Sequence, residues 1–463
     1  MPVEFDAIII GAGQAGPSLA ARFSKEGQRV AIIERKHFGG TCVNTGCIPT
    51  KTLVASAYVA HMARRAQDYG VDNRAVSVDM KRVKARKDAI VEQSRDGLSQ
   101  LLGNLDKVTI YKGHARFTAP RTVEVKGELL SADRIFVNSG GRAAVPKMPG
   151  LDAVPFLTNS TMMEVDFLPD HLLIVGGSYV GLEFAHVYRR FGARVTVVEM
   201  ADRLIVREDP DISDAVREIL EADGVEVRLK AECLAVEKDG DRIAMNLECA
   251  AGAPRIHGSH VLLAVGRRPN TEDLGLDKAG VQVDAKGFIT VDDQCRTNVD
   301  GIWALGEVNG RGAFTHTSYN DFEIVAANLF DNDPRRISDR ITCYGLFIDP
   351  PLGRVGMTEQ EVRQKGLKAL YAKKMMTSVG RARERGETKG FMKVVVDAES
   401  RRILGAAVLG VNGDEVVHAI LDVMAAGLPY TAISRTMHIH PTVAEYLPTL
   451  LGELQPIGSL PAI

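Results

Sequence analysis

The sequence predicts an α/β protein with two parallel-sheet domains of the same kind and an α+β domain at the C-terminus. Three observations predict it: a βαβ pattern occurs twice, the chain has 463 residues, and its pattern changes near Arg340. A chain of this length can hold two to four domains with cores of their own. The composition, 45% hydrophobic and 25% charged, is that of an ordinary soluble globular protein.

Charge and hydropathy exclude several classes of partner. The formal net charge of −2 argues against nucleic acid or an anionic membrane as the main partner. No apolar run reaches 18 residues, so we expect no transmembrane helix. The N-terminal "MPVEFDAIIIG" lacks the parts of a signal peptide, and we therefore expect a cytoplasmic protein. In that reducing compartment, close cysteine pairs are more often catalytic or metal-binding than structural.

The repeat defines the two parallel-sheet domains. Residues 7–34, "AIIIGAGQAGPSLAARFSKEGQRVAIIE", align without a gap with residues 172–199, "LLIVGGSYVGLEFAHVYRRFGARVTVVE". Each copy is an apolar run, a glycine turn, a helical pattern, a glycine stop and a second apolar run that ends in glutamate. This order is typical of a βαβ unit in a parallel sheet.

The glycines and the terminal acid of each copy predict a dinucleotide site. The first glycine makes a tight turn, the next lets the backbone approach a pyrophosphate, and the last lets helix and strand pack closely. The helix N-terminus offers free N–H groups, and the acid can accept a hydrogen bond from a ribose 2′-hydroxyl. The residues are Gly11, Gly13, Gly16 and Glu34 in the first copy, and Gly176, Gly181 and Glu199 in the second, where Ser178 replaces the middle glycine.

Glu199 also bears on the choice of nucleotide at the second site. A carboxylate there repels a 2′-phosphate, so we expect NAD(H) to be preferred over NADP(H). Arg203 and Arg207 follow nearby and keep NADP(H) open, although they are more typical of a solvated loop.

The rest of the chain divides by pattern. "AVGRRPN", which contains Gly266, is typical of a strand leaving the second nucleotide domain, and "TNVDGIWALGEV" of a strand returning to the first. From about Arg340 the pattern changes to strand-like runs and amphipathic helices. The predicted divisions are residues 1–150 for the first domain, 151–270 for the second, 271–338 for the returning central segment and 339–463 for the third domain.

The segment "GGTCVNTGCIPTK" holds Cys42 and Cys47. The four other cysteines are scattered, which disfavours a zinc site and makes them core or surface thiols. Pro49 suits the first turn of a helix, and thiols at a helix N-terminus have a lowered pKa. The pair follows a dinucleotide unit by about ten residues, which suggests electron transfer through sulfur.

This segment resembles the active site of the class I flavin-dependent pyridine nucleotide–disulfide oxidoreductases, which include dihydrolipoamide dehydrogenase, glutathione reductase and mercuric reductase. The resemblance covers essentially the whole chain. It implies that the first nucleotide domain binds FAD and the second NAD(P)H. It also implies that Cys42 meets the substrate, that Cys47 lies nearest the flavin, and that Lys51 sits by the flavin N5 and pairs with Glu183.

The resemblance extends to further cofactor contacts. The Ala115 backbone would meet the adenine, and His316, near a helix start at Thr315, would lie by the flavin O2. Glu307, in "ALGE", stands where members have Ala-x-Gly-Asp and still supplies a carboxylate for the ribityl chain. Tyr179 falls where some members have an aromatic gate over the flavin; packing is its alternative role. Thr41 and Gly140 complete the expected FAD residues, and Gly266 the expected NAD residues.

The segment "HIHPTVAEYLP" contains His440 and, five residues later, Glu445. This matches the family's His–Glu pair, which serves as acid and base for the dithiol of the other subunit. A metal site at His438 and His440 would need further ligands, and none are nearby; a structural histidine pair is the other alternative. The resemblance thus implies an obligate C2 homodimer built on the third domain.

We expect an FAD-dependent oxidoreductase that passes electrons between NAD(P)H, preferably NADH, and a disulfide, dithiol or metal ion through Cys42 and Cys47. Dihydrolipoamide dehydrogenase proper and a non-enzymatic redox-sensing flavoprotein remain alternatives. A third alternative is a mercuric-reductase-like or Cu(II)- or reactive-chlorine-resistance reductase. Residues 51–116 and "GRGAFTHTSYNDFEIV" resemble these reductases more than they resemble dihydrolipoamide dehydrogenases. The end "GELQPIGSLPAI" lacks the cysteine pair with which mercuric reductases hand over the metal ion, which disfavours Hg(II) reduction by that route. The cysteine pair at Cys42 and Cys47 argues against a soluble transhydrogenase, because such members of the family lack it.

Overall fold

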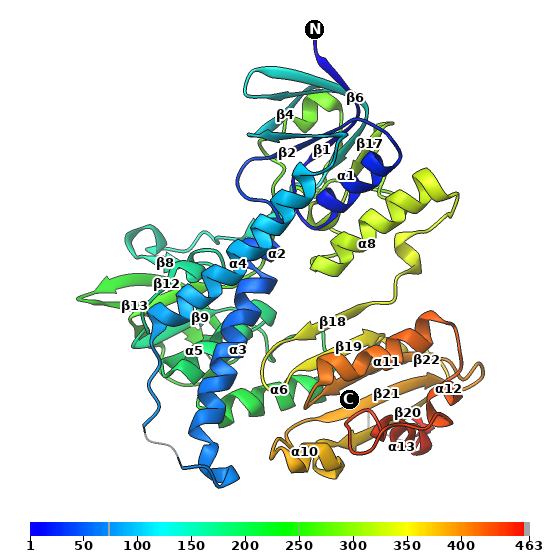
Figure 1. Cartoon of the computed structure of the whole chain (residues 1–463). Coiled ribbons are helices and arrows are strands. Elements are labelled where there is room, and N and C mark those ends of the chain that lie inside the picture. The colour runs from blue at the N-terminus through cyan, green and yellow to red at the C-terminus, as the bar shows by residue number, and fades with distance from the viewer. Residues whose placement is uncertain (73–74, 250, 458–463) are drawn as a thin grey trace.

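The structure, a computed structural model, describes residues 1–72, 75–249 and 251–457. Three sheets dominate it, and helices from different parts of the chain lie between and beside them (Figure 1). The first and second sheets contain the two βαβ repeats, and the third is built from residues beyond 342. The predicted fold class, two Rossmann-like domains and a C-terminal α+β domain, is confirmed.

The first domain holds the N-terminal repeat. Its elements are β1 (Val3–Ile10), α1 (Ala15–Lys25), β2 (Val30–Glu34), α2 (Gly40–Thr45), α3 (Cys47–Arg64), α4 (Met80–Gly103), β3 (Val108–Lys112), β4 (Ala115–Ala119), β5 (Thr122–Val125), β6 (Glu128–Val137), β17 (Ile302–Ala304) and α8 (Thr315–Ala326). The parallel strands run in the order β3-β2-β1-β6-β17, and the antiparallel pair β4–β5 joins the start of β6. Helix α1 buries Ala15, Leu19 and Phe23, four residues apart.

The second domain repeats this plan. Its elements are β8 (Phe156–Leu157), β9 (His171–Val175), α5 (Tyr179–Phe191), β10 (Arg194–Val198), α6 (Pro210–Ala222), β11 (Glu226–Arg228), β12 (Ala231–Asp239), β13 (Arg242–Cys249), β14 (Arg255–Gly258) and β15 (His260–Leu263). A parallel sheet runs in the order β11-β10-β9-β15-β8, and β12-β13-β14 form a separate antiparallel sheet. Gly192, at φ +121°, follows α5 as Gly27, at φ +76°, follows α1, so both helices end at a glycine.

A two-stranded ribbon links these domains. It consists of β7 (Gly141–Ala143), by which the chain leaves the first domain, and β16 (Arg267–Pro269), by which it returns. The returning segment includes α7 (Leu276–Ala279) and continues into β17 and α8. The two nucleotide domains are therefore joined by two neighbouring backbones, which restricts how they can move relative to each other.

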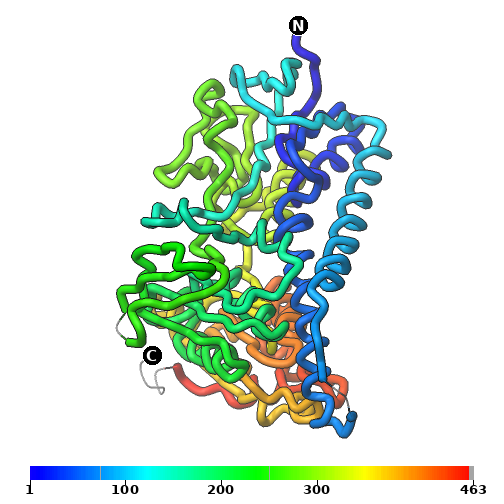
Figure 2. Tube along the Cα trace, turned by 90° about the vertical axis from the view of Figure 1, so that its left-hand side faces the viewer, coloured from blue at the N-terminus to red at the C-terminus, as the bar shows by residue number. Residues whose placement is uncertain are grey.

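Helices α3 and α4 lie side by side along the molecule, as Figure 2 shows in blue. Helix α3 also packs on α5 of the second domain, where Leu53 and Ala57 share an apolar core with Leu182 and Ala185. Because α3 begins at Cys47, this packing brings the cysteine segment of the first domain next to the glycine-turn helix of the second.

The third domain is an antiparallel sheet with helices. Its elements are β18 (Cys343–Leu346), β19 (Leu352–Gly356), α9 (Glu359–Gln364), β20 (Ala369–Met375), α10 (Gly380–Glu384), β21 (Phe391–Asp397), β22 (Ile403–Leu409), α11 (Gly413–Ala425), α12 (Thr431–Ser434), α13 (Tyr446–Gly452) and β23 (Gln455–Pro456). The strand order is β18-β19-β22-β21-β20-β23. Helix α11 packs on β19 and β22. The apolar runs "FMKVVVD" and "ILGAAVLG" of the sequence are its central strands.

Buried ion pairs dock the third domain on the second. The guanidinium of Arg354 donates to Glu208 with an Nε–Oε2 distance of 3.0 Å, and the Nζ atom of Lys393 lies 2.8 Å from Oδ2 of Asp209. Each of these four side chains is at most 1% exposed. Paired in this way, the charges offset the desolvation that an unpaired buried charge would suffer.

Within the residues that the structure describes, no helix is both long and apolar enough to cross a membrane.

Candidate functional site

The first glycines of the two repeats have the same geometry. Gly11 has φ +106°, and a Cβ atom there would lie 2.3 Å from the carbonyl oxygen of Asn138. Gly176 has φ +113°, and a Cβ atom there would lie 2.5 Å from the carbonyl oxygen of Ala264. Only glycine satisfies both the backbone angle and the space, so each turn passes tightly over the end of a neighbouring strand.

The last glycines of the repeats also correspond. A Cβ atom on Gly16 would lie 2.3 Å from the oxygen of Gly11, and one on Gly181 would lie 2.1 Å from the oxygen of Gly176. Each helix therefore packs against its own glycine turn, as a dinucleotide fold requires.

The two terminal acids make equivalent hydrogen bonds. Oε2 of Glu34 accepts from the N–H of Ala12 at 3.0 Å, and Oε2 of Glu199 accepts from the N–H of Gly177 at 2.6 Å. The other oxygen of each accepts from the N–H two residues later, at 2.7 and 2.8 Å. The carboxylates are thus held at the glycine turns, where the ribose hydroxyls of a dinucleotide are bound in this type of fold.

The helix N-termini at both turns fit a pyrophosphate. Neither Gln14 before α1 nor Ser178 before α5 caps its helix with a side-chain hydrogen bond. The first N–H groups of each helix are therefore left without a capping side chain, and the helix dipole favours an anion there. At the first turn, a Cβ atom on Gly40 would lie 2.9 Å from Cα of Gly13, so α2 closes over the turn with no side chain between them. These features fit FAD at the first turn and NAD(P)H at the second.

Ala115 and Gly140, two further residues expected to bind FAD, lie at the edge of the first domain. The N–H of Gly113 donates to the carbonyl of Glu34 at 2.9 Å, which places the strand that begins at Ala115 beside that acid. Gly140 has φ +65°, and its carbonyl accepts from the N–H of Asn270 at 2.9 Å. The turn after β6 is therefore fixed by the chain returning from the second domain.

Three expected residues meet at the ribbon between the domains. The hydroxyl of Thr41 points to the carbonyl of Gly141 at 3.5 Å. Arg267 follows Gly266 (φ +120°) and donates to both carboxylate oxygens of Glu307, with an Nη2–Oε2 distance of 2.8 Å. The expected FAD residues Thr41 and Glu307 and the expected NAD residue Gly266 thus lie within one connected group of contacts.

The cysteine pair spans the junction of two helices. Cys42 is the third residue of α2 and Cys47 the first of α3, with Gly46 between the helices. Both carry free thiols and are partly buried. The positive end of the α3 dipole therefore lies at Cys47.

The structure separates the two thiols by pKa. A hydrogen bond from Cys42 lowers the pKa of Cys47 to about 6, and the Thr315 hydroxyl and the Lys51 charge act in the same direction against burial. The pKa of Cys42 is raised, because its proton is shared with Cys47 and because it is buried. These contacts favour a Cys47 thiolate hydrogen-bonded by a Cys42 thiol as the form of the reduced pair.

Lys51 is paired with Glu183 by two hydrogen bonds of 2.9 and 2.7 Å. Oε1 of Glu183 also accepts from the N–H of Phe347 at 3.1 Å, and the Lys51 Nζ atom lies 4.4 Å from the centre of the Phe347 ring. The three residues come from the first, second and third domains. These contacts fix the Lys51 ammonium, on the helix that begins at Cys47, at a point where all three domains meet.

Helix α8 begins at Thr315 and touches the thiol. The Thr315 hydroxyl lies 2.9 Å from the sulfur of Cys47. Nε2 of His316 donates to the carbonyl of Cys343 at 2.7 Å, and its ring stacks on Phe314 with centroids 5.3 Å apart. The His316 ring is thus anchored to the third domain and oriented by an aromatic neighbour.

Tyr179 is the first residue of α5 and belongs to an aromatic cluster. Its ring meets Phe314 edge-on at 6.1 Å and Tyr344 edge-on at 5.5 Å, and Tyr344 donates to Glu208 at 2.8 Å. Among the described residues, the buried Tyr179 hydroxyl has no hydrogen-bond partner of standard geometry, and burial raises its pKa to about 12. The ring therefore lies at the second glycine turn, packed against Phe314 and Tyr344.

His440 lies on the surface of the third domain. Its Nδ1 is 2.8 Å from Oε2 of Glu445, and its side chain is 80% exposed while that of Glu445 is 15% exposed. The neighbouring Met437 and Ile439 are 95% and 80% exposed. Among the described residues, no hydrogen bond or ion pair joins His440 to either thiol of its own chain.

Three residues of this site were not predicted. Thr315, Phe347 and Arg267 contact Cys47, Glu183 and Glu307 respectively. The nearest signals in the sequence were the helix start at Thr315 and the "AVGRRPN" segment, and neither indicates what its residue touches. Their roles depend on contacts between segments more than 35 residues apart.

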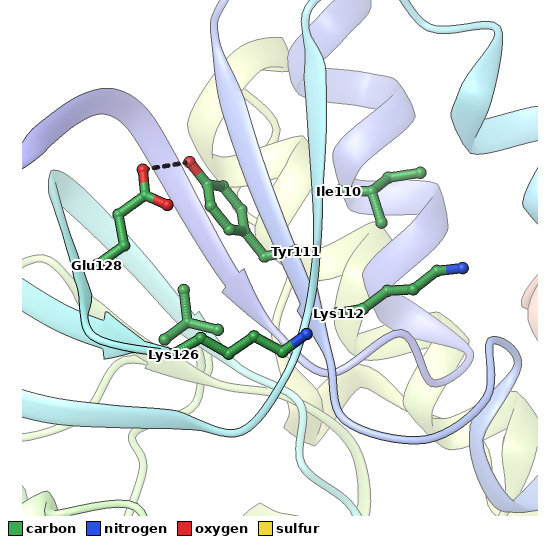
Figure 3. A pocket seen from close by; sticks show the side chains of 6 residues that line it. Ile110, Tyr111, Lys112, Lys126 and Glu128 are labelled. Carbon is green, nitrogen blue, oxygen red and sulfur yellow. Dashed lines mark hydrogen bonds between the residues drawn. The ribbon is translucent and has the colours of Figure 1, made fainter.

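A hollow elsewhere on the first domain lies apart from this site. It is lined by β3 and the turn between β5 and β6, and Figure 3 shows Tyr111 hydrogen-bonded to Glu128 at its rim, with Lys112 and Lys126 nearby. None of the predicted site residues lines it. In the described part of the chain, no group of three or more His, Cys, Asp or Glu side chains could hold a metal ion.

Two families match the chain in succession. Residues 5–321 match "Pyridine nucleotide-disulphide oxidoreductase", and residues 343–451 match its "dimerisation domain". The first match spans both nucleotide domains, and the second begins where the third sheet begins.

Named relatives match over nearly the full length. The probable pyridine nucleotide-disulfide oxidoreductase RclA of Escherichia coli (strain K12) is 35% identical, with 97% of this chain and 99% of the relative covered. A mercuric reductase of Bacillus cereus is 31% identical (96% and 70% covered), and a dihydrolipoyl dehydrogenase of Chlamydia muridarum is 32% identical (96% of each covered). A solved Cu(II) complex of HOCl-induced flavoprotein disulfide reductase RclA from Escherichia coli has a TM-score of 0.88 and 34% identity, covering 96% of this chain and 99% of that one.

Proposed function

The chain belongs to the pyridine nucleotide–disulphide oxidoreductase family, and on that premise we propose that Cys42 and Cys47 are its redox-active pair and that its preferred acceptor is a small organic disulfide. The protein is an enzyme that uses FAD and NAD(P)H. When bound, FAD would supply the two-electron redox chemistry that links the nicotinamide to the disulfide. What the side chains contribute follows from their contacts.

The supporting observation is the difference in pKa between the two thiols. Two electrons and one proton open the Cys42–Cys47 disulfide to a Cys47 thiolate and a Cys42 thiol, the protonation state that the contacts of Thr315 and Lys51 favour. The Cys47 charge is stabilised where it forms, at the start of α3. Cys42 keeps its proton and therefore stays inactive until a base removes it.

His440 with Glu445 supplies that base in our proposal. His440 of the partner subunit takes the Cys42 proton, and the resulting thiolate attacks one sulfur of the acceptor to form a mixed disulfide. The same imidazolium gives its proton to the departing thiolate, and Glu445 stabilises the positive ring meanwhile. The Cys47 thiolate then attacks the Cys42 sulfur, which restores the disulfide and releases the second thiolate, to be protonated by solvent.

The need for proton transfer favours a disulfide over a metal ion. A thiolate leaving group must be protonated, whereas a reduced metal ion takes up no proton. Cu(II) is nonetheless the second candidate acceptor, because a relative 34% identical to this chain has been solved as a Cu(II) complex.

We propose a homodimer in which each subunit completes the other's site. The C-terminal domain is the family's dimerisation domain, and His440 lies on its surface between two exposed apolar side chains, Met437 and Ile439. Exposed apolar side chains around a polar group are typical of an interface. Because the reaction consumes NAD(P)H, we place it in the cytoplasm, where that donor is supplied.

Steady-state oxidation of NADH with a panel of acceptors tests the proposal. The panel contains small disulfides, quinones, Cu(II) and Hg(II). We expect the highest kcat/KM for a disulfide and a loss of its turnover in Cys42→Ser. Turnover with oxygen alone would contradict the proposed disulfide reduction, and Cu(II) turnover without disulfide turnover would select the second candidate.

A further inference from the structure

The ribbon between the two nucleotide domains holds the carboxylate of Glu307. Strand β7 begins with Gly141 and follows β6, which ends under the first glycine turn. Its ribbon partner β16 begins with Arg267 and follows β15, which ends under the second glycine turn. Glu307 follows the returning strand β17 and is 16% exposed. Both strands of the ribbon therefore lie against the Glu307 side chain, β7 at Gly141 and β16 at Arg267.

Arg267 binds this acid through two atoms of its guanidinium. Nε and Nη2 donate to the two carboxylate oxygens of Glu307, and Nη2 also donates to the carbonyl of Gly141 at 2.7 Å. A two-point contact of this kind fixes the plane of the carboxylate as well as its position. Each oxygen keeps a second lone pair, with which it can accept a ligand hydroxyl.

Gly141 provides the room that this acid occupies. A Cβ atom on Gly141 would lie 2.6 Å from Oε2 of Glu307 and 3.0 Å from the carbonyl oxygen of Arg268. Its φ angle lies outside the left-handed region, so an alanine would meet no backbone strain there. The glycine is needed for space alone.

We propose that Arg267 and Gly141 are positioning residues for FAD. Glu307 has one methylene more than the aspartate of the Ala-x-Gly-Asp segment that it resembles; the absent side chain of Gly141 accommodates the added length, and the fork of Arg267 orients the carboxylate. The inference rests on the proposed role of Glu307 in holding FAD.

The first test adds a methyl group at the contact. Gly141→Ala displaces the Glu307 carboxylate, and we expect the dissociation constant of FAD to rise about tenfold, which corresponds to one good hydrogen bond to a charged group. The measurement is FAD fluorescence on titration into apoprotein. Gly97→Ala is the matched control, because a Cβ atom there meets nothing within 4 Å. The melting temperature of the apoprotein should be unchanged, which separates positioning from folding.

The second test restores the fit. In Gly141→Ala/Glu307→Asp the shorter acid withdraws from the added methyl group, so we expect the double variant to bind FAD more tightly than Gly141→Ala alone. Arg267→Gln should weaken FAD binding more than Arg267→Lys, which keeps the charge without the fork. If the effects of Gly141→Ala and Glu307→Asp on the dissociation constant of FAD simply multiply in the double variant, the proposed compensation is wrong.

Glu307→Ala separates this inference from its premise. If it releases FAD while Gly141→Ala and Arg267→Gln bind FAD like the wild type, the positioning proposal is wrong and the role of Glu307 stands. If Glu307→Ala also binds FAD like the wild type, Glu307 does not hold the cofactor.

Discussion

Lys51 and Glu183 join the helix that begins with Cys47 to the helix that opens the second nucleotide turn. Their N–O distances are 2.9 and 2.7 Å, and the side chain of Glu183 is 7% exposed. Because Phe347 of the third domain donates to the same carboxylate, the charge beside the thiol depends on contacts among all three domains. The chemistry of Cys47 is therefore sensitive to how the domains dock.

Replacing either member of this pair should move the pKa of Cys47, in opposite directions. Lys51→Met removes a charge that favours the thiolate, and we expect the pKa to rise from about 6 by about one unit. Glu183→Gln removes a charge that opposes the thiolate, and the pKa should fall. The rate of iodoacetamide labelling of the reduced protein against pH measures both. Lys84→Met, whose ammonium pairs with Asp88, is the control; a shift there as large as in Lys51→Met would contradict the local explanation.

Thr315 should influence the same thiol by hydrogen bonding. Its hydroxyl lies 2.9 Å from the Cys47 sulfur and lowers the thiol pKa. Thr315→Val keeps the shape and loses the hydroxyl, so we expect a higher Cys47 pKa and slower labelling at pH 6, while Thr315→Ser should resemble the wild type. Equal labelling profiles for the Val and Ser variants would show that the contact does not stabilise the thiolate.

The lowered pKa of Cys47 also predicts a pH-dependent stability. The thiol has a pKa of about 6 in the folded protein against an ordinary value of 9.0. Ionisation therefore stabilises the reduced folded protein fully above pH 9, and this contribution is lost as the pH falls through about 6. Urea unfolding of the reduced wild type and Cys47→Ala should show a stability difference that shrinks over this range. A difference constant with pH would refute the shift.

His440 should act on the thiol of the other subunit. We expect His440→Ala to slow disulfide reduction about 100-fold while FAD reduction by NADH is unaffected. In a mixed dimer of His440→Ala and Cys42→Ser subunits, one site of two combines an intact Cys42 with an intact His440, so activity should reappear. His438→Ala serves as the control for the local segment. Mixed dimers as inactive as their parents would contradict action across the subunits, because a His440 that served the Cys42 of its own subunit would leave no intact pair in such a dimer.

Glu199 should set the preference between the two nicotinamide nucleotides. It is held at the second glycine turn by the N–H of Gly177, where its charge opposes a 2′-phosphate. Glu199→Gln keeps a hydrogen-bond acceptor and removes the charge, so the ratio of kcat/KM for NADH over NADPH in FAD reduction should fall about tenfold. A wild-type enzyme that prefers NADPH would show that this carboxylate is not decisive.

The sequence could predict whatever depends on local pattern. The two βαβ repeats, both glycine turns and the cysteine segment rest on residues within about 30 positions of each other, where spacing alone carries the geometry. The close approach of Gly11 to Asn138 and of Gly176 to Ala264 gives these turns their physical reason. The different pKa values of Cys42 and Cys47 could not be read in this way, because Thr315 is 268 residues from Cys47.

By itself the sequence determined the fold class and the family and pointed to the close cysteine pair, because each follows from glycine, acid and cysteine spacings that tolerate few alternatives. Only the tertiary structure decided which groups surround each thiol, what holds Glu307 and where His440 lies. Those properties depend on electrostatic and steric contacts of 2.8 to 4.4 Å between residues that lie far apart in the chain. Such contacts leave no periodic signal in the chain, because the partners meet only once the tertiary fold brings distant segments together.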